Sequence, residues 1–164
     1  MTLPIRRRVG TCLAALALVV GLSTGCTAGD WRYEAPPAAG VQADAGPVKV
    51  RNLMVLADAE GQGLLLGSIF TTEAVKLTAV GVSAEQQDGT FGAPTPVALT
   101  GDVPINGGLV LGGDDSRVEK AGLQEGLLAK VMMQFSDGTT AAVEAPVLSS
   151  DNADYKAAWD KING

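Results

Sequence analysis

The chain has 164 residues, of which 46% are hydrophobic, and its formal net charge is −6. A negative charge of this size repels nucleic acid and anionic lipid headgroups, so we expect no nucleic-acid partner. The sequence contains no histidine, which excludes the Ser-His-Asp triad and the usual zinc sites and removes the commonest general base near neutral pH.

Residues 1–25 have the pattern of an export signal. Arg6, Arg7 and Arg8 form a basic start, and the apolar run TCLAALALVVGL follows. This run is too short for a bilayer-spanning helix, which needs about 20 residues, but it suits a signal peptide. The segment LSTGC then places small residues directly before Cys26 and resembles a bacterial lipoprotein cleavage site. We therefore expect a lipid anchor at Cys26 that holds the chain at the extracytoplasmic face of the cell membrane.

Two alternatives remain for this leader, namely an ordinary signal peptide cleaved elsewhere and an uncleaved N-terminal anchor. The export route is also open, since IRRRVG carries arginines without the rest of the twin-arginine pattern. The other cysteine, Cys12, lies inside the leader, so the exported part can form no internal disulfide and no thiolate metal site.

Residues 26–46 and 47–148 differ in composition. The first segment is rich in Ala, Gly and Pro without apolar periodicity, which predicts a flexible tether. In the second, short apolar runs alternate with turn residues, the pattern of an all-β sandwich or barrel. Asp137-Gly138 marks a hairpin turn. We expect strands at 48–56, 63–71, 75–83, 108–112, 127–135 and 140–148, and one or two within 97–105.

Residues 149–164 form a tail of different character. Asp151 or Asn152 can cap a short helix, in which Tyr155, Trp159 and Ile162 share one face at spacings of four and three residues. The alternative is a disordered terminus, and the sequence does not decide between the two.

Three carboxylates within six positions, Asp114, Asp115 and Glu119, are the first candidate site. They could be ligands of Ca²⁺, which takes six to eight oxygen ligands in proteins. On a strand, however, Asp115, Arg117 and Glu119 would share one face, and Arg117 would pair with both acids. We favour this second interpretation, a solvated charged rim.

Methionine thioethers are the second candidate, because they are soft ligands for Cu(I). Met132 and Met133 are adjacent, so on a strand they point to opposite faces and cannot line one site. At least one of them is expected to fill the core, and so is Met54.

Three segments of the second half of the chain carry a resemblance to a known family, namely VPINGGLVL, GLQEGLLAKVMMQFSDG and AVEAPV. Together they make residues 97–147 resemble the periplasmic copper chaperone family called PCu(A)C and its divergent lipoprotein relatives in actinobacteria. The resemblance implies a cupredoxin-like or immunoglobulin-like β-sandwich. It also implies a His-x-Met pair of copper ligands shortly before Gly122, and these two positions are Arg117 and Glu119 here. The guanidinium has no lone pair to offer and the carboxylate is a hard donor, so the copper ligands of the family are absent.

These observations favour a non-catalytic, lipid-anchored β-sandwich that binds a protein partner or assists envelope assembly. We expect no cofactor, since the sequence singles out no catalytic nucleophile, no base and no metal site. The alternative is a copper chaperone with relocated ligands, drawn from Met132, Met54 and carboxylates; calcium at Asp114, Asp115 and Glu119 is a weaker candidate.

Overall fold

The computed structural model describes residues 39–163. The expected export signal, Cys26 and most of the expected tether lie outside these residues. Within them, no helix is long and apolar enough to cross a membrane.

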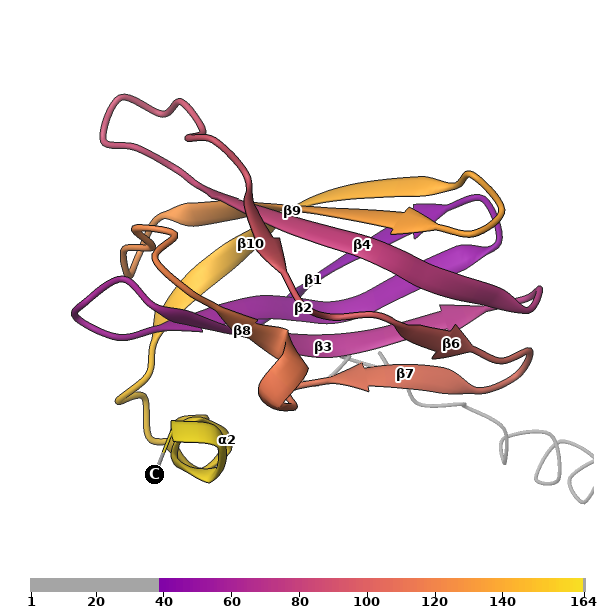
Figure 1. Ribbon diagram of the computed structural model, residues 1–164. Helices are drawn as coiled ribbons and strands as arrows, with labels where there is room; N and C mark the ends of the chain where they lie inside the picture. Colours follow the sequence, from indigo (N-terminus) through magenta and orange to yellow (C-terminus); the bar gives the residue numbers. More distant parts are fainter. Residues whose placement is uncertain (1–38, 164) are drawn as a thin grey trace, which may run out of the picture. The chain divides into compact units, whose positions relative to one another are not determined.

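The described part is an all-β fold followed by one short helix, as the sequence predicted (Figure 1). One or two strands were expected within residues 97–105, and the structure has one there, β6, while β5 begins earlier and ends at Val97. The elements are β1 Val41–Ala45, β2 Val48–Ala57, β3 Gly63–Thr71, β4 Val75–Ala84, β5 Thr95–Val97, β6 Gly101–Val103, β7 Gly108–Leu111, the 3-10 helix η1 Asp114–Ser116, β8 Arg117–Val118, β9 Leu128–Phe135, β10 Thr140–Ser149 and α2 Lys156–Asn163.

The strands form one ten-stranded sheet that curls into two packed layers. Its main path runs β5-β4-β9-β10-β2-β3-β7, with β6 beside β4, and β1 and β8 beside β2 and β3. We call β1, β2, β3, β7 and β8 sheet A, and β4, β5, β6 and β9 sheet B. β10 joins the two, because residues 140–146 pair antiparallel with β9 and residues 147–149 pair parallel with β2.

The core lies between the two layers and is built from alternate residues of each strand, as period-2 patterning requires. In β2 the alternation is interrupted by a bulge at Asn52, whose φ is 51°, and the pairing with β3 shifts between Arg51 and Met54. The bulge returns Leu53 to the core side after Val50, so both are fully buried. Opposite the bulge lies Gly67, with a φ of 147°.

The tether expectation needs a correction at its end, because residues 41–45 form β1 and pair antiparallel with β2. The Arg51 guanidinium ties the two strands together by donating to the Asp44 carboxylate and to the Ala43 carbonyl (3.2 Å). The hydrogen bond from Arg51 lowers the pKa of Asp44 below its usual value. The segment VQADA does alternate apolar and polar residues, but it is only five residues long and Ala has low strand propensity, so it was assigned to the tether.

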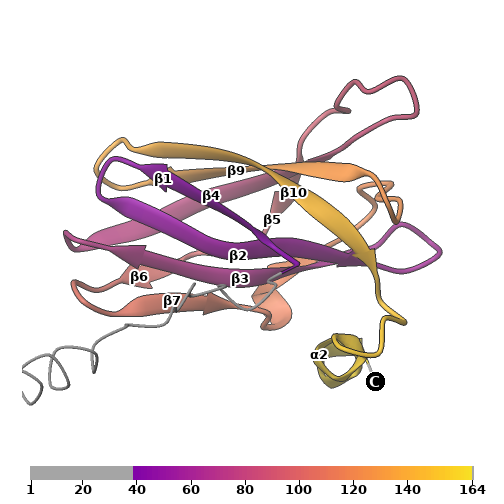
Figure 2. The same ribbon diagram turned by 180° about the vertical axis from the view of Figure 1, so that it is seen from behind.

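The tail forms α2, so the helical alternative for residues 149–164 is confirmed for the described part. Asn152, one of the two expected caps, accepts a hydrogen bond from the Asp154 N–H through its side-chain oxygen (3.0 Å). In both views the helix lies outside the sandwich, beside the outer face of sheet A (Figures 1 and 2).

Candidate functional site

The acidic segment of residues 112–120 does not continue as a strand. Asp114–Ser116 form η1, and the strand β8 begins only at Arg117. The buried Ser116 hydroxyl causes this turn, because it accepts a hydrogen bond from the Gly112 N–H (3.0 Å) and lies 3.4 Å from the Asp115 carboxylate. The expectation that residues 115, 117 and 119 alternate on one strand face is therefore wrong.

The ion pair of Arg117 also differs from the expected one. Its guanidinium lies 3.6 Å from the carboxylate of Asp114, and the two side chains are 40% and 86% exposed. Pairs this exposed contribute about 0–1 kcal/mol. Asp114, Arg117 and Glu119 line a cavity of about 300 Å³ beside Pro96 and Ala98. The charged rim therefore exists, but it contains Asp114 in place of the expected Asp115.

The three candidate calcium ligands are not brought together. Among residues 39–163, no group of three or more Asp, Glu, His or Cys side chains is placed to hold a metal ion. Asp114 and Glu119 face the same cavity with the Arg117 guanidinium, whereas Asp115 lies beside Ser116. A cation in that cavity would have to compete with the Arg117 guanidinium, which lies 3.6 Å from the Asp114 carboxylate.

The three methionines of the domain have three different environments. Met133 is 1% exposed and belongs to the central core, whereas Met132 is 40% exposed on the outer face of sheet B, which confirms that the two point to opposite faces. Met54 is 1% exposed but lies outside the central core cluster, on the outer face of sheet A. Because packed sheets are about 10 Å apart, the thioethers of Met54 and Met132 cannot share a metal.

The outer face of sheet B carries a groove that was not predicted. Pairing of β5, β4, β9 and β10 aligns Pro96, Gly81, Met132 and Ala142 in one row across four strands. Gly81 leaves a gap in this row, since a Cβ there would meet nothing closer than Pro94 at 3.5 Å. The result is an apolar hollow of about 280 Å³, which we call the Met132 groove. Its lining is Ala79, Val80, Gly81, Pro94, Pro96, Met132 and Gln134.

Two features of the sequence could have indicated this groove. Gly81 places a residue without a side chain on the outward side of β4, and Met132 stands on the outward side of β9. A single exposed apolar residue is common on protein surfaces, so only the combination of Met132 with the gap at Gly81 points to a contact surface.

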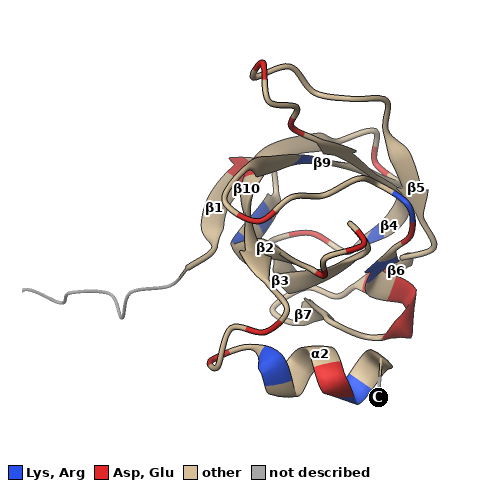
Figure 3. Ribbon diagram, turned by 90° about the vertical axis from the view of Figure 1, so that its left-hand side faces the viewer, with Lys and Arg blue, Asp and Glu red and all other residues tan. Residues whose placement is uncertain are grey.

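Charged side chains lie beside the groove and at one end of the sandwich, but not in the groove itself: the Lys130–Glu144 ion pair stands on the same outer face, next to the row of Met132 and Ala142. At one end of the sandwich, acidic residues stand on several loops (Figure 3). Asp58, Glu125 and Asp151 line a shallow cavity at this end together with Ser149 and Ser150. The Met132 groove, by contrast, is lined by uncharged residues throughout.

Comparison with known proteins gives similarities at the level of structure alone. No protein-family model matches the chain, and no curated protein matches it. Among solved structures, the apo PCuAC domain from PmoF1 is 18% identical, with a TM-score of 0.47, over 66% of this chain and 99% of that domain. The copper-bound PCuAC domain from PmoF2 is 13% identical, with a TM-score of 0.45, over 66% of this chain and 98% of that domain.

Both matched structures are PCuAC domains, the domain type that the sequence of residues 97–147 resembles. Identities of 13–18% do not transfer a ligand or a function to this chain. The β-sandwich itself is established by the strands and their pairing.

Proposed function

We propose that this chain is a lipoprotein, anchored through Cys26 at the extracytoplasmic face of the cell membrane, whose β-sandwich binds a protein partner without catalysing a reaction. The Met132 groove is the observation that carries the proposal. It is an apolar hollow of about 280 Å³ lined by uncharged residues, and exposed apolar surface can mark a protein–protein contact site. Its proline walls and its missing side chain at Gly81 would accept an apolar side chain of the partner.

The titratable groups of the domain support a non-catalytic role. Active sites are where pKa values depart from their ordinary range through burial and charge. In residues 39–163, the shifted pKa values belong to the exposed groups Asp44, Asp88, Asp137 and Lys156, and hydrogen bonds to neighbouring side chains are the largest cause of each shift. None of these four lines the Met132 groove.

The alternative function, a copper chaperone with relocated ligands, does not fit the donors that the structure offers. Met54 and Met132 lie on opposite outer faces, and Met133 is enclosed by the core. Calorimetric titration with Cu(I) tests this directly. Stoichiometric binding that Met132→Leu abolishes would restore the alternative, and the proposal expects no such binding.

Filling the groove tests the proposed function. The variant Gly81→Arg places a long side chain in the hollow, and Val110→Arg adds the same side chain at a 74% exposed position of sheet A. In chains extracted from membranes with a mild detergent, we expect a partner to co-purify with wild type and Val110→Arg but not with Gly81→Arg. Co-purification with Gly81→Arg at the wild-type level would refute the groove as the binding site.

A further inference from the structure

A second apolar surface lies on the opposite side of the sandwich, on the outer face of β2 and β3. The pairing of these strands places Met54 opposite Leu66 and Leu56 opposite Leu64. The core-facing residues of the same strands are their neighbours in sequence, so these four side chains point outward. Met54, Leu56 and Leu64 are nevertheless 1%, 0% and 0% exposed, although they do not belong to the central core cluster.

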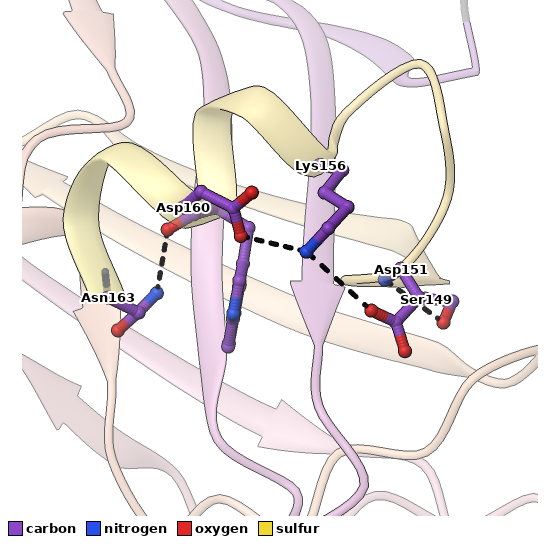
Figure 4. A network of polar contacts seen from close by, with 6 residues as sticks. Ser149, Asp151, Lys156, Asp160 and Asn163 are labelled. Atoms are coloured by element: carbon purple, nitrogen blue, oxygen red, sulfur yellow. Dashed lines mark hydrogen bonds and ion pairs between the residues drawn. The ribbon is translucent and has the colours of Figure 1, made fainter.

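The helix α2 lies over this outer face. It lies outside the sandwich near the end where β2 and β3 are joined (Figures 1 and 2), and the close view shows it in front of the translucent purple strands (Figure 4). Half-buried residues of the tail recur at helical spacing, whereas the remaining residues of α2 are exposed. One face of the helix therefore packs against the protein, as in an amphipathic surface helix. The half-buried residues are Tyr155, Ala158, Trp159 and Ile162.

The polar contacts of the tail do not fasten it to the sheet. The Lys156 ammonium lies 2.9 Å from Asp160 and 3.9 Å from Asp151, and the Asn163 amide donates to the Trp159 carbonyl (Figure 4). All of these groups belong to residues 149–163. The last backbone hydrogen bond to the sheet runs from the Ser150 N–H to the Ala57 carbonyl (2.9 Å). Beyond it, apolar contact holds the helix in place.

A helix of eight residues is marginal in water by itself, so α2 depends on the surface beneath it. The dependence is mutual, because removing the helix would expose the outward side chains of β2 and β3 as one patch. An apolar surface whose occupant is a short helix without polar anchoring can exchange that occupant for another helix of the same chemistry.

We propose that the outer face of β2 and β3 is a docking surface for a short amphipathic helix, and that α2 is its intramolecular occupant. The partner is a helical segment that presents aromatic and aliphatic side chains at i, i+4 and i+7, as Tyr155, Trp159 and Ile162 do. Because α2 is tethered beside the surface, it competes at a local concentration in the millimolar range. Only a helix that binds better than α2 displaces it, so the surface is closed until that partner is present. This surface is separate from the Met132 groove, and the inference does not rest on the proposed function.

Oxidation of methionine by hydrogen peroxide, read by mass spectrometry on the full chain, tests whether α2 is a removable cover. Met132 is the exposed reference, Met133 is the core reference, and Met54 reports on the covered surface. In Trp159→Ala we expect Met54 to oxidise about tenfold faster than in wild type, which corresponds to a cover weakened by about 1.4 kcal/mol. Met133 should stay protected. In Lys161→Ala, which changes an exposed residue of the same helix, Met54 should stay protected as well.

Two outcomes of this experiment would overturn the inference. If Met54 remains protected in both Trp159→Ala and a second variant, Ile162→Ser, α2 does not cover the surface. If Met133 becomes reactive together with Met54, the helix is part of the global fold and not a separate cover.

A peptide with the sequence of residues 150–164 tests docking from outside the chain. We expect the labelled peptide to bind full-length Trp159→Ala and to restore the protection of Met54, with much weaker binding to wild type, whose own helix competes. The same peptide carrying Trp159→Ala is the matched control and should not bind. If the unaltered peptide does not protect Met54, the surface is not a helix-docking site, and this result would leave the Met132 groove untouched.

Discussion

Gly67 faces the bulge of β2 at a distance that leaves no room for a side chain. A Cβ at this position would lie 3.1 Å from backbone atoms of Arg51, Asn52 and Leu53, and its φ of 147° is one that other residues rarely adopt. We expect Gly67→Ala to lower the free energy of unfolding by about 1–3 kcal/mol, measured by urea denaturation. Gly81→Ala is the matched control, since its Cβ has space, and it should stay within about 0.5 kcal/mol of wild type. Equal stability of the two variants would contradict the tight packing at the bulge.

Asp137 gives the β9–β10 hairpin a dependence on pH. Its carboxylate accepts hydrogen bonds from the Thr139 hydroxyl (2.7 Å) and N–H (2.9 Å), and these lower the pKa of Asp137 below its usual value. Because the pKa of Asp137 is lower in the folded than in the unfolded state, its carboxylate stabilises the fold fully above the unfolded pKa of about 3.9. This contribution to stability is lost as the pH falls through the folded pKa.

Asp137→Asn should therefore flatten the acid limb of the stability curve. The amide keeps an acceptor oxygen in the turn but does not titrate in this range. We expect the melting temperature to fall less steeply with decreasing pH below about 4 in Asp137→Asn than in wild type. Parallel melting curves at every pH would show that the turn does not contribute this stability.

At the scale of elements, β1 belongs to the sheet even though the sequence assigned it to the tether. Its half-buried residues Val41, Ala43 and Ala45 pack against the core, and it shields the edge of β2. A fragment of residues 47–164 should be less stable than one of residues 39–164 by at least about 2 kcal/mol, since several backbone hydrogen bonds of roughly 0.5–1.5 kcal/mol are lost. Denaturation of the two fragments measures this difference. Matching midpoints would mean that β1 is dispensable.

The longer strands could be predicted because each carries a regular alternation or a continuous apolar run bounded by turn residues. The expected boundaries of β2, β3, β4, β9 and β10 differ from the observed ones by at most one residue. η1 could not be predicted in this way, because the turn depends on the Ser116 hydroxyl reaching back to the Gly112 N–H. The prediction assumed that residues 115–119 alternate as in a strand, but residues 114–116 form a 3-10 turn instead.

The burial of β2 and β3 on both faces is visible in the sequence, although it was not predicted. The unbroken runs LMVLA and LLL place apolar residues on both faces, which is typical of strands covered on both sides. The amphipathic face of residues 155–162 was recognised, but no pattern in one sequence tells which surface a helix covers. For the same reason, the row of Pro96, Gly81, Met132 and Ala142 needs strand order and register before it can be seen.

At the scale of the whole molecule, the two outer faces of the sandwich differ. On sheet A the outward side chains Met54, Leu56 and Leu64 of β2 and β3 are buried beside α2, although Val110 of β7 is exposed, whereas the outer face of sheet B carries the open Met132 groove. Anchoring at Cys26 would keep the domain close to the membrane surface, where such a groove can meet a membrane-bound partner. The anchor is thus an integral part of the proposed function.

Lipidation at Cys26 is tested by cell fractionation with a radiolabelled fatty acid. Cys26→Ser should lose the label and move from the membrane to the soluble fraction, whereas Cys12→Ser should behave as wild type because it lies in the leader. If Cys26→Ser still sediments with the membrane, the leader is an uncleaved anchor.

The measurement that tests the central claim most directly is photo-crosslinking from the groove in intact cells. A photoreactive amino acid replaces Met132, and the control carries it at Val110, on the other sheet. The account predicts a discrete crosslinked complex from position 132 that disappears when Gly81→Arg is added, and no such complex from position 110. Identical crosslinks from both positions, or a complex that survives Gly81→Arg, would contradict it.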